Sequence, residues 1–214
     1  MDVVLEPPAP RKRGRPAKNK PVTITPVADC ETESNVRQSR GCCIALQTML
    51  TCFENDLMLY VPALCDAIWT PFNENLPLSP AIDNQSRVNW LALLEISLPV
   101  LHESLLSEIF PNVRILEAHL YCSKKAVRHM AARVFSQMCL LPHRNGSKFI
   151  IFALESILPN LSSTDDDVFK KRGSIECFSE VVTKLKLRIL PYASILIVPM
   201  LSTSSDCDEQ VRLM

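Results

Sequence analysis

One five-residue template recurs four times along this chain, and its spacing limits the folds that the chain can adopt. Each copy sets a proline after two bulky apolar residues and places another apolar residue two positions after the proline. The copies cover residues 60–64, 109–113, 157–161 and 197–201, and hold Pro62, Pro111, Pro159 and Pro199. These prolines are 49, 48 and 40 residues apart. A spacing this regular indicates a chain built from copies of one structural unit.

A second phrase repeats in step with the prolines. Val127-Arg128 and Val211-Arg212 are the same pair of residues, and Val168 follows three aspartates between them. The valines are 41 and 43 residues apart. Periods of about 40–47 residues with two helical stretches each are typical of HEAT and armadillo repeats, which stack into a solenoid. The sequence therefore predicts an all-α, right-handed solenoid of about three and a half units, and favours binding over catalysis.

The N-terminal segment differs in composition from the rest of the chain. It is rich in proline and then polar, without apolar periodicity, so we expect a disordered tail over 1–33 and the repeat array over 34–214. Residues 1–20 hold six Lys/Arg and two acids, whereas the remaining 194 residues hold 17 basic and 21 acidic ones. A basic tail on a mildly acidic body favours a polyanion as the partner of the tail.

Apolar residues at a period of 3.6 predict the helices of the array. The expected helices cover 34–53, 57–69, 87–100, 102–121, 124–141, 149–161 and 167–185. The recurring prolines are expected to kink the first helix of a unit. Pro71 is expected to end the second helix, a long loop to cover 72–86, and Pro142 with Asn145-Gly146 to form a break.

Charged residues predict how two helices begin. Asp165, Asp166 and Asp167 suit the N-terminus of the helix over 167–185, because free N–H groups and the helix dipole favour negative charge there. The sequence of residues 208–214 predicts the first turn of a further helix. Because a solenoid normally ends in a polar capping unit, the array is expected to continue in a longer protein.

Neither the cysteines nor the glycines indicate a chemical centre. The nine cysteines include no C-x-x-C pair, so we expect reduced thiols and no metal site. Five of them are expected on apolar helix faces, namely Cys52, Cys65, Cys122, Cys139 and Cys177. No glycine is followed by Lys-Ser/Thr, so a phosphate-binding loop is not expected. We therefore expect no catalytic residue and no small-molecule substrate, and no apolar run is long enough for a membrane span.

The tail carries a basic motif with a glycine between two arginines. It consists of Arg11, Lys12, Arg13, Gly14, Arg15 and Pro16, followed by Lys18 and Lys20. Arg13-Gly14-Arg15-Pro16 resembles the core of an AT-hook, an extended strip that fits a narrow A·T-rich minor groove. A nuclear import signal has the same composition, and one peptide can serve both purposes.

The run over 126–133 is expected to have a packing role. Val127 and the alanines would face a neighbouring helix, while Arg128 would reach a carboxylate of an adjacent unit. Arg133 belongs to the same run. His129 has no partner at triad-like spacing, so we expect no catalytic use of it.

From about residue 36 to its end, the chain resembles the repeat region of the TATA-binding-protein-associated factors of the Swi/Snf ATPase class. The residues that carry the resemblance are 39–41, 62–67 with Pro71, 126–133, 171–176, 190–199 and 211–214. The run over 126–133 is the most specific part of it.

The resemblance implies HEAT repeats just before a helicase-like motor, in a nuclear regulator that grips TATA-binding protein and uses ATP to strip it from DNA. ATP and Mg would belong to the motor, so no cofactor is expected on this chain. The contacts of the family with TATA-binding protein lie mainly in earlier repeats, and none is carried onto a residue here. This segment would be a docking or spacer surface. The family is not associated with an AT-hook at this position, so the tail is either lineage-specific or a basic linker.

The alternative is a generic HEAT scaffold with a nuclear import signal, such as an import receptor or a phosphatase subunit. Such a protein would share the repeats but not the run over 126–133.

Overall fold

The chain forms helices throughout the parts that the structure describes. The structure is a computed structural model, and it describes residues 33–73, 82–101, 103–141, 143–162, 167–206 and 209–212. No β-strand occurs in these ranges, so the expected all-α class is confirmed for them.

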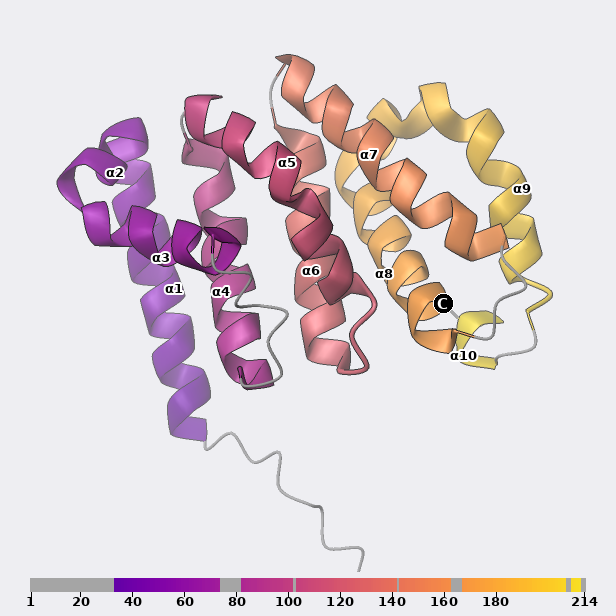
Figure 1. The fold of residues 1–214 in the computed structure, drawn as a ribbon, viewed down its shortest axis with the longest axis horizontal. Helices are drawn as coiled ribbons and strands as arrows, with labels where there is room; N and C mark the ends of the chain where they lie inside the picture. The colour runs from indigo at the N-terminus through magenta and orange to yellow at the C-terminus, as the bar shows by residue number, and fades with distance from the viewer. Residues whose placement is uncertain are drawn as a thin grey trace, which may run out of the picture.

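The helices lie in two rows that alternate along the chain (Figure 1). The first row consists of α1 (Glu33–Phe53), α4 (Asn84–Ser97), α6 (Lys125–Leu140), α8 (Val168–Leu185) and the short α10 (Glu209–Arg212). The second row, which crosses the first, consists of α3 (Pro62–Asn73), α5 (Glu103–Leu120), α7 (His143–Ser162) and α9 (Ala193–Thr203). Short helical segments join them: η1 (Glu54–Asp56), α2 (Leu57–Tyr60), η3 (Leu98–Val100) and η4 (Lys186–Tyr192). Each helix of the first row therefore packs beside the next one.

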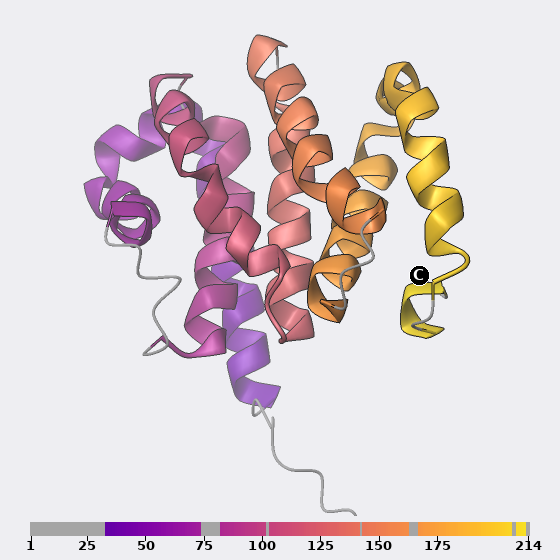
Figure 2. The same ribbon diagram turned by 45° about the vertical axis from the view of Figure 1, so that its right-hand side comes forward.

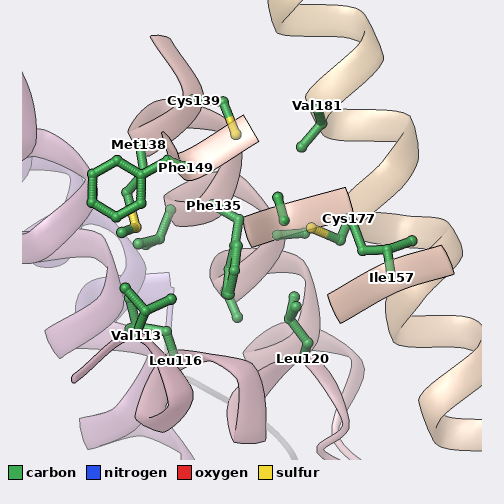
Figure 3. Close-up of a cluster of buried hydrophobic side chains, with 14 of the residues drawn as sticks. Val113, Leu116, Leu120, Phe135, Met138, Cys139, Phe149, Ile157, Cys177 and Val181 are labelled. Atoms are coloured by element: carbon green, nitrogen blue, oxygen red, sulfur yellow. The ribbon is translucent and has the colours of Figure 1, made fainter. Parts of the chain in front are cut away.

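The main core lies where α5, α6, α7 and α8 meet. Figure 3 shows apolar side chains from all four helices pointing toward one another, including Leu116 of α5, Phe135 of α6, Ile157 of α7 and Val181 of α8. Helix α6 contacts α4, α5, α7 and α8. Two of its alanines, Ala131 and Ala132, are fully buried, and short side chains of this kind allow neighbouring helices to approach closely.

The cysteines divide between the core and the surface. Cys139 and Cys177 are buried, and burial raises the pKa of the Cys139 thiol to about 12. Burial also raises the pKa of the Cys177 thiol, so both thiols stay protonated and unreactive at neutral pH. Cys65 and Cys122 are partly buried, but the expectation that Cys52 lies on a packed face is wrong, because it is exposed. Cys52 belongs to the end of α1, where little of the helix is covered.

The template prolines occupy two kinds of position. Pro111, Pro159 and Pro199 lie inside α5, α7 and α9, as expected for the first helix of a unit. Pro62 instead begins α3. The residue before a proline avoids helical geometry, and Val61 accordingly has φ −129° and ψ 72° and separates α2 from α3. The single helix expected over 57–69 is therefore two helices.

Two further expectations about helix ends are wrong. Pro71 does not end α3, which continues to Asn73. The break expected at Asn145-Gly146 is part of α7, which begins at His143; Pro142 itself lies outside the described residues. A side chain at Gly146 would collide with the carbonyl oxygen of Leu141. This glycine therefore serves a close approach of the backbone and not a turn.

Two helices begin at an acidic cap, of which one was expected. Asp167 accepts hydrogen bonds from the N–H groups of Phe169 and Lys170 at 3.1 and 3.2 Å, which confirms the capping of α8. Asp165 and Asp166 lie outside the described residues. Asp83 likewise caps α4 by accepting from the N–H of Ser86. Helix α4 thus begins inside the loop that we expected over 72–86.

The apolar positions of the template are buried only where another helix covers them. Ile109 of α5 and Ile157 of α7 are fully buried, whereas the equivalent Ile197 of α9 is 53 % exposed. Leu161 of α7 is 5 % exposed and the equivalent Leu201 of α9 is 66 % exposed. Figure 2 shows α9 at one edge of the array. The same sequence template therefore gives a core face inside the array and an apolar surface on α9.

Replacing Gly173 by alanine is expected to destabilise the protein. Gly173 of α8 is buried, and a Cβ there would collide with the carbonyl oxygen of Leu120 and lie 2.8 Å from its carbon. Because the obstacle is backbone, Gly173→Ala should lower the free energy of unfolding by about 3 kcal/mol. Gly41→Ala is the matched control, since nothing lies within 4 Å of that helical glycine. It should raise stability by about 0.5–1 kcal/mol. Urea denaturation of both variants measures the difference, and equal effects would contradict the packing described here.

Candidate interaction surface on the first helix row

The basic tail cannot be placed in the structure. Its motif lies outside the described residues, so the role expected for Arg11 to Lys20 stays a prediction. The described part of the chain offers the first helix row, which carries the run over 126–133 on α6.

Arg128 joins α6 to α8 in the interior. One of its terminal nitrogens donates to the carbonyl oxygens of Cys122 and Ser123, each at 3.0 Å, and the other to Glu176 Oε1 of α8, also at 3.0 Å. The side chains of Arg128 and Glu176 are only 6 and 7 % exposed. The expectation that Arg128 reaches a carboxylate of an adjacent helix is confirmed. Val127 beside it is fully buried.

Arg133 joins α6 to α4 on the other side. It contacts Glu95 at two points: Nε donates to Oε1 at 3.0 Å, and Nη2 lies 2.9 Å from Oε2 in an ion pair. Paired bonds of this kind fix the relative orientation of the two groups as well as their distance. Because Arg128 and Arg133 are five residues apart, they leave the helix in different directions. Helix α6 is therefore tied to both of its neighbours in the row.

The second repeated phrase is only partly regular in the structure. Val211 is buried like Val127, and Arg212 donates to the carbonyl oxygen six residues before it, as Arg128 does to that of Cys122. Val168 differs, since it is half-buried and is the first residue of its helix, whereas Val127 and Val211 are the third of theirs. The expected equivalence therefore fails at Val168, because the Asp167 cap starts α8 at its valine, whereas α6 and α10 start two residues before theirs.

A trough of about 790 Å³ runs over the exposed side of α4, between α1 and α6. Its floor includes Val88, Ala92 and Ile96 of α4, and its α6 wall includes Met130 and Arg133. A narrower groove of about 420 Å³, lined mostly by apolar atoms, separates α1 from α4 and shares Ala92 and Ile96 with the trough. The sequence did not indicate this surface or the partners Glu95 and Glu176. The sequence shows only that each neighbouring helix carries a carboxylate, Glu95 in α4 and Glu176 in α8, that could face α6.

The described residues offer no other chemical centre. They contain no group of three or more His, Cys, Asp or Glu side chains that could hold a metal ion. No described helix has both the length and the apolar character needed to cross a membrane. His129 is half exposed and lies 4.0 Å from Glu180, a surface pair of little energetic weight.

Sequence comparison shows what this helical array is related to. The chain is 29 % identical to TATA-binding protein-associated factor mot1 of Schizosaccharomyces pombe, over 86 % of its own length. It is 34 % identical to TATA-binding protein-associated factor 172 of Homo sapiens over 83 % of its length, and 29 % identical to the mot1 protein of Aspergillus fumigatus over 82 %. The chain spans about one tenth of the length of these relatives. No protein-family model matches it.

These matches confirm the resemblance to the TATA-binding-protein-associated factors. The related region covers most of the chain and corresponds to a short segment of each relative.

Removing the Arg128 guanidinium is expected to cost far more stability than removing that of Arg133. Arg128→Met leaves Glu176 charged and buried and takes the donor from two carbonyls, so the free energy of unfolding should fall by about 3–5 kcal/mol. Arg133 is 42 % exposed, so Arg133→Met should cost only about 1 kcal/mol. The double variant Arg128→Met/Glu176→Leu should be more stable than Arg128→Met alone. Chemical denaturation of all three tests this, and similar losses for the two arginines would show that the interior pair is not special.

Proposed function

We propose that this chain is the HEAT-repeat segment of a nuclear transcription regulator that binds TATA-binding protein and removes it from DNA by means of an ATPase motor outside this chain. One observation carries the proposal: the chain matches three TATA-binding protein-associated factors over more than four fifths of its length. The helical array, in which successive helices alternate between two rows, supports it, because stacked helix pairs are what a HEAT solenoid would have. ATP and Mg would act in the motor and have no ligand on this chain.

Within that regulator, the segment would serve as a docking or spacer surface. Its two ion pairs, one interior and one at the surface, join three helices of the first row, which suits a rigid connector between a gripping array and a motor. A generic HEAT scaffold with a nuclear import signal is the alternative function.

The native protein provides the test. An antibody against residues 34–214 should precipitate TATA-binding protein together with the natural gene product from nuclear extract. The immunopurified protein should then release TATA-binding protein from a TATA-containing duplex when ATP is added, but not with a non-hydrolysable analogue. If TATA-binding protein is not precipitated, or if its release from DNA does not depend on ATP hydrolysis, the result would favour the generic scaffold.

We also propose that the tail binds A·T-rich DNA. Arg13 and Arg15 would enter the minor groove, Gly14 would allow close approach, and Pro16 would direct the chain along the groove. The flanking residues Arg11, Lys12, Lys18 and Lys20 would contact phosphates, which makes the affinity fall steeply with salt.

Titration of labelled A·T and G·C duplexes with the full chain tests the tail. Arg13→Ala/Arg15→Ala should abolish the preference for A·T, whereas Lys18→Ala/Lys20→Ala should weaken both duplexes about equally. Equal binding of the two duplexes by the unmodified chain would leave only a basic linker or an import signal.

A further inference from the structure

The trough over α4 has the dimensions of a helix-binding site. The stretch of α4 that lines it, from Gln85 to Ile96, is about 16 Å long, which is about three helical turns, and Pro99 extends it. Helices α1 and α6 form its two walls, as expected from their places on either side of α4 (Figure 1). An amphipathic helix in such a groove inserts apolar side chains at positions i, i+3 or i+4, and i+7. Val88, Ala92 and Ile96 offer them an apolar floor with a small residue at its centre.

The positive charges that line this trough are more exposed than the negative one. Glu95 and Arg133 form a pair, but the carboxylate side chain is 10 % exposed whereas the guanidinium side chain is 42 % exposed. Lys184 of α8 is exposed and adds a second cation to the lining. The other polar lining residues are neutral, chiefly the amides Gln47, Gln85, Asn89 and Gln137. A molecule that approaches the trough therefore meets two cations and one largely covered carboxylate.

We propose that this trough binds an amphipathic helix of a partner protein whose apolar face is flanked by acidic residues. The apolar floor takes the buried face of the helix, and the acidic flank pairs with Lys184 and the exposed part of Arg133. A nucleic acid would need a series of basic side chains placed along its phosphates, and the trough has only two cations beside an apolar floor. This favours a protein partner over a nucleic acid. This inference goes beyond the proposed function, because it holds for a scaffold that has nothing to do with TATA-binding protein.

A designed peptide provides the probe. It is a fluorescein-labelled helix of eighteen residues with leucines along one face and glutamates beside them, compared with a scrambled peptide of the same composition and with a version that carries lysine in place of glutamate. Fluorescence anisotropy with the full chain should give saturable micromolar binding of the glutamate peptide, measurably weaker binding of the lysine peptide and no saturable binding of the scrambled peptide. Circular dichroism and thermal unfolding establish that each protein variant remains folded.

Two substitutions locate the binding. Ala92→Trp fills the floor of the trough and should abolish binding. Lys184→Glu should weaken the glutamate peptide about three- to fivefold, the range expected for one exposed charge pair, and should strengthen the lysine peptide by a similar factor. Lys186→Glu is the matched control: it makes the same charge change two residues away, on an exposed residue outside the trough, and should leave both affinities unchanged.

The reversal of peptide preference distinguishes this site from simple adhesion to exposed apolar surface such as that of α9. The proposal is overturned if the scrambled peptide binds equally well, if Ala92→Trp binds as the natural chain does, or if Lys184→Glu and Lys186→Glu behave alike. If Ala92→Trp fails to fold, the charge reversal at Lys184 decides alone. None of these results bears on whether the native protein releases TATA-binding protein from DNA.

Discussion

The packing of α6 against α8 depends on the buried ion pair between Arg128 and Glu176. Removing two charges from water costs several kcal/mol for each, and only good geometry offsets this. The geometry here is incomplete, because Arg128 Nε and Glu176 Oε2 are buried without a hydrogen-bond partner among the described residues. The pair is thus better understood as fixing register than as adding stability. A shift of α8 by one residue would turn Glu176 by about 100° and leave a buried cation unpaired. Gly173 next to Leu120 permits the close approach that this geometry requires.

The two arginines of α6 make the first helix row unequal along its length. Helices α4, α6 and α8 are joined by side-chain pairs and by a continuous core. Helix α1 is joined far less closely, since Leu50 is its only buried side chain among those described, and it does not belong to that core. The narrower groove lies between α1 and α4, and the trough extends from α1 across α4 to α6. Both openings therefore border α1, the helix of the row that is least closely joined to the core.

The parts of the fold that local pattern determines could be predicted from the sequence, and the parts that neighbours determine could not. Apolar periodicity located the main helices, and the prolines inside α5, α7 and α9 marked the second row. The same template at Pro62 marks the start of a helix instead. The five residues of the template do not show whether the proline lies inside a helix or begins one. Gly146 was interpreted as a break, since glycine favours turns and close backbone approaches alike. The run over 126–133 predicted that Arg128 would find a carboxylate. Its partner Glu176, 48 residues away, depends on the packing of α8.

Repetition explains the fold of this chain, but the differences between its units explain its surface. Equivalent template positions are buried in α5 and α7 and exposed in α9, so the sequence of a unit does not decide what it presents to solvent. Likewise, the joint between α6 and α8 is filled by Arg128 and Glu176, whereas the joint between α1 and α4 is open and lined by short or apolar side chains such as Ala92. A stacked array has few enclosed cavities in which to bind a partner. The selectivity of the docking surface proposed here would therefore come from joints at which one unit departs from the repeated pattern, and α4 lies beside such a joint.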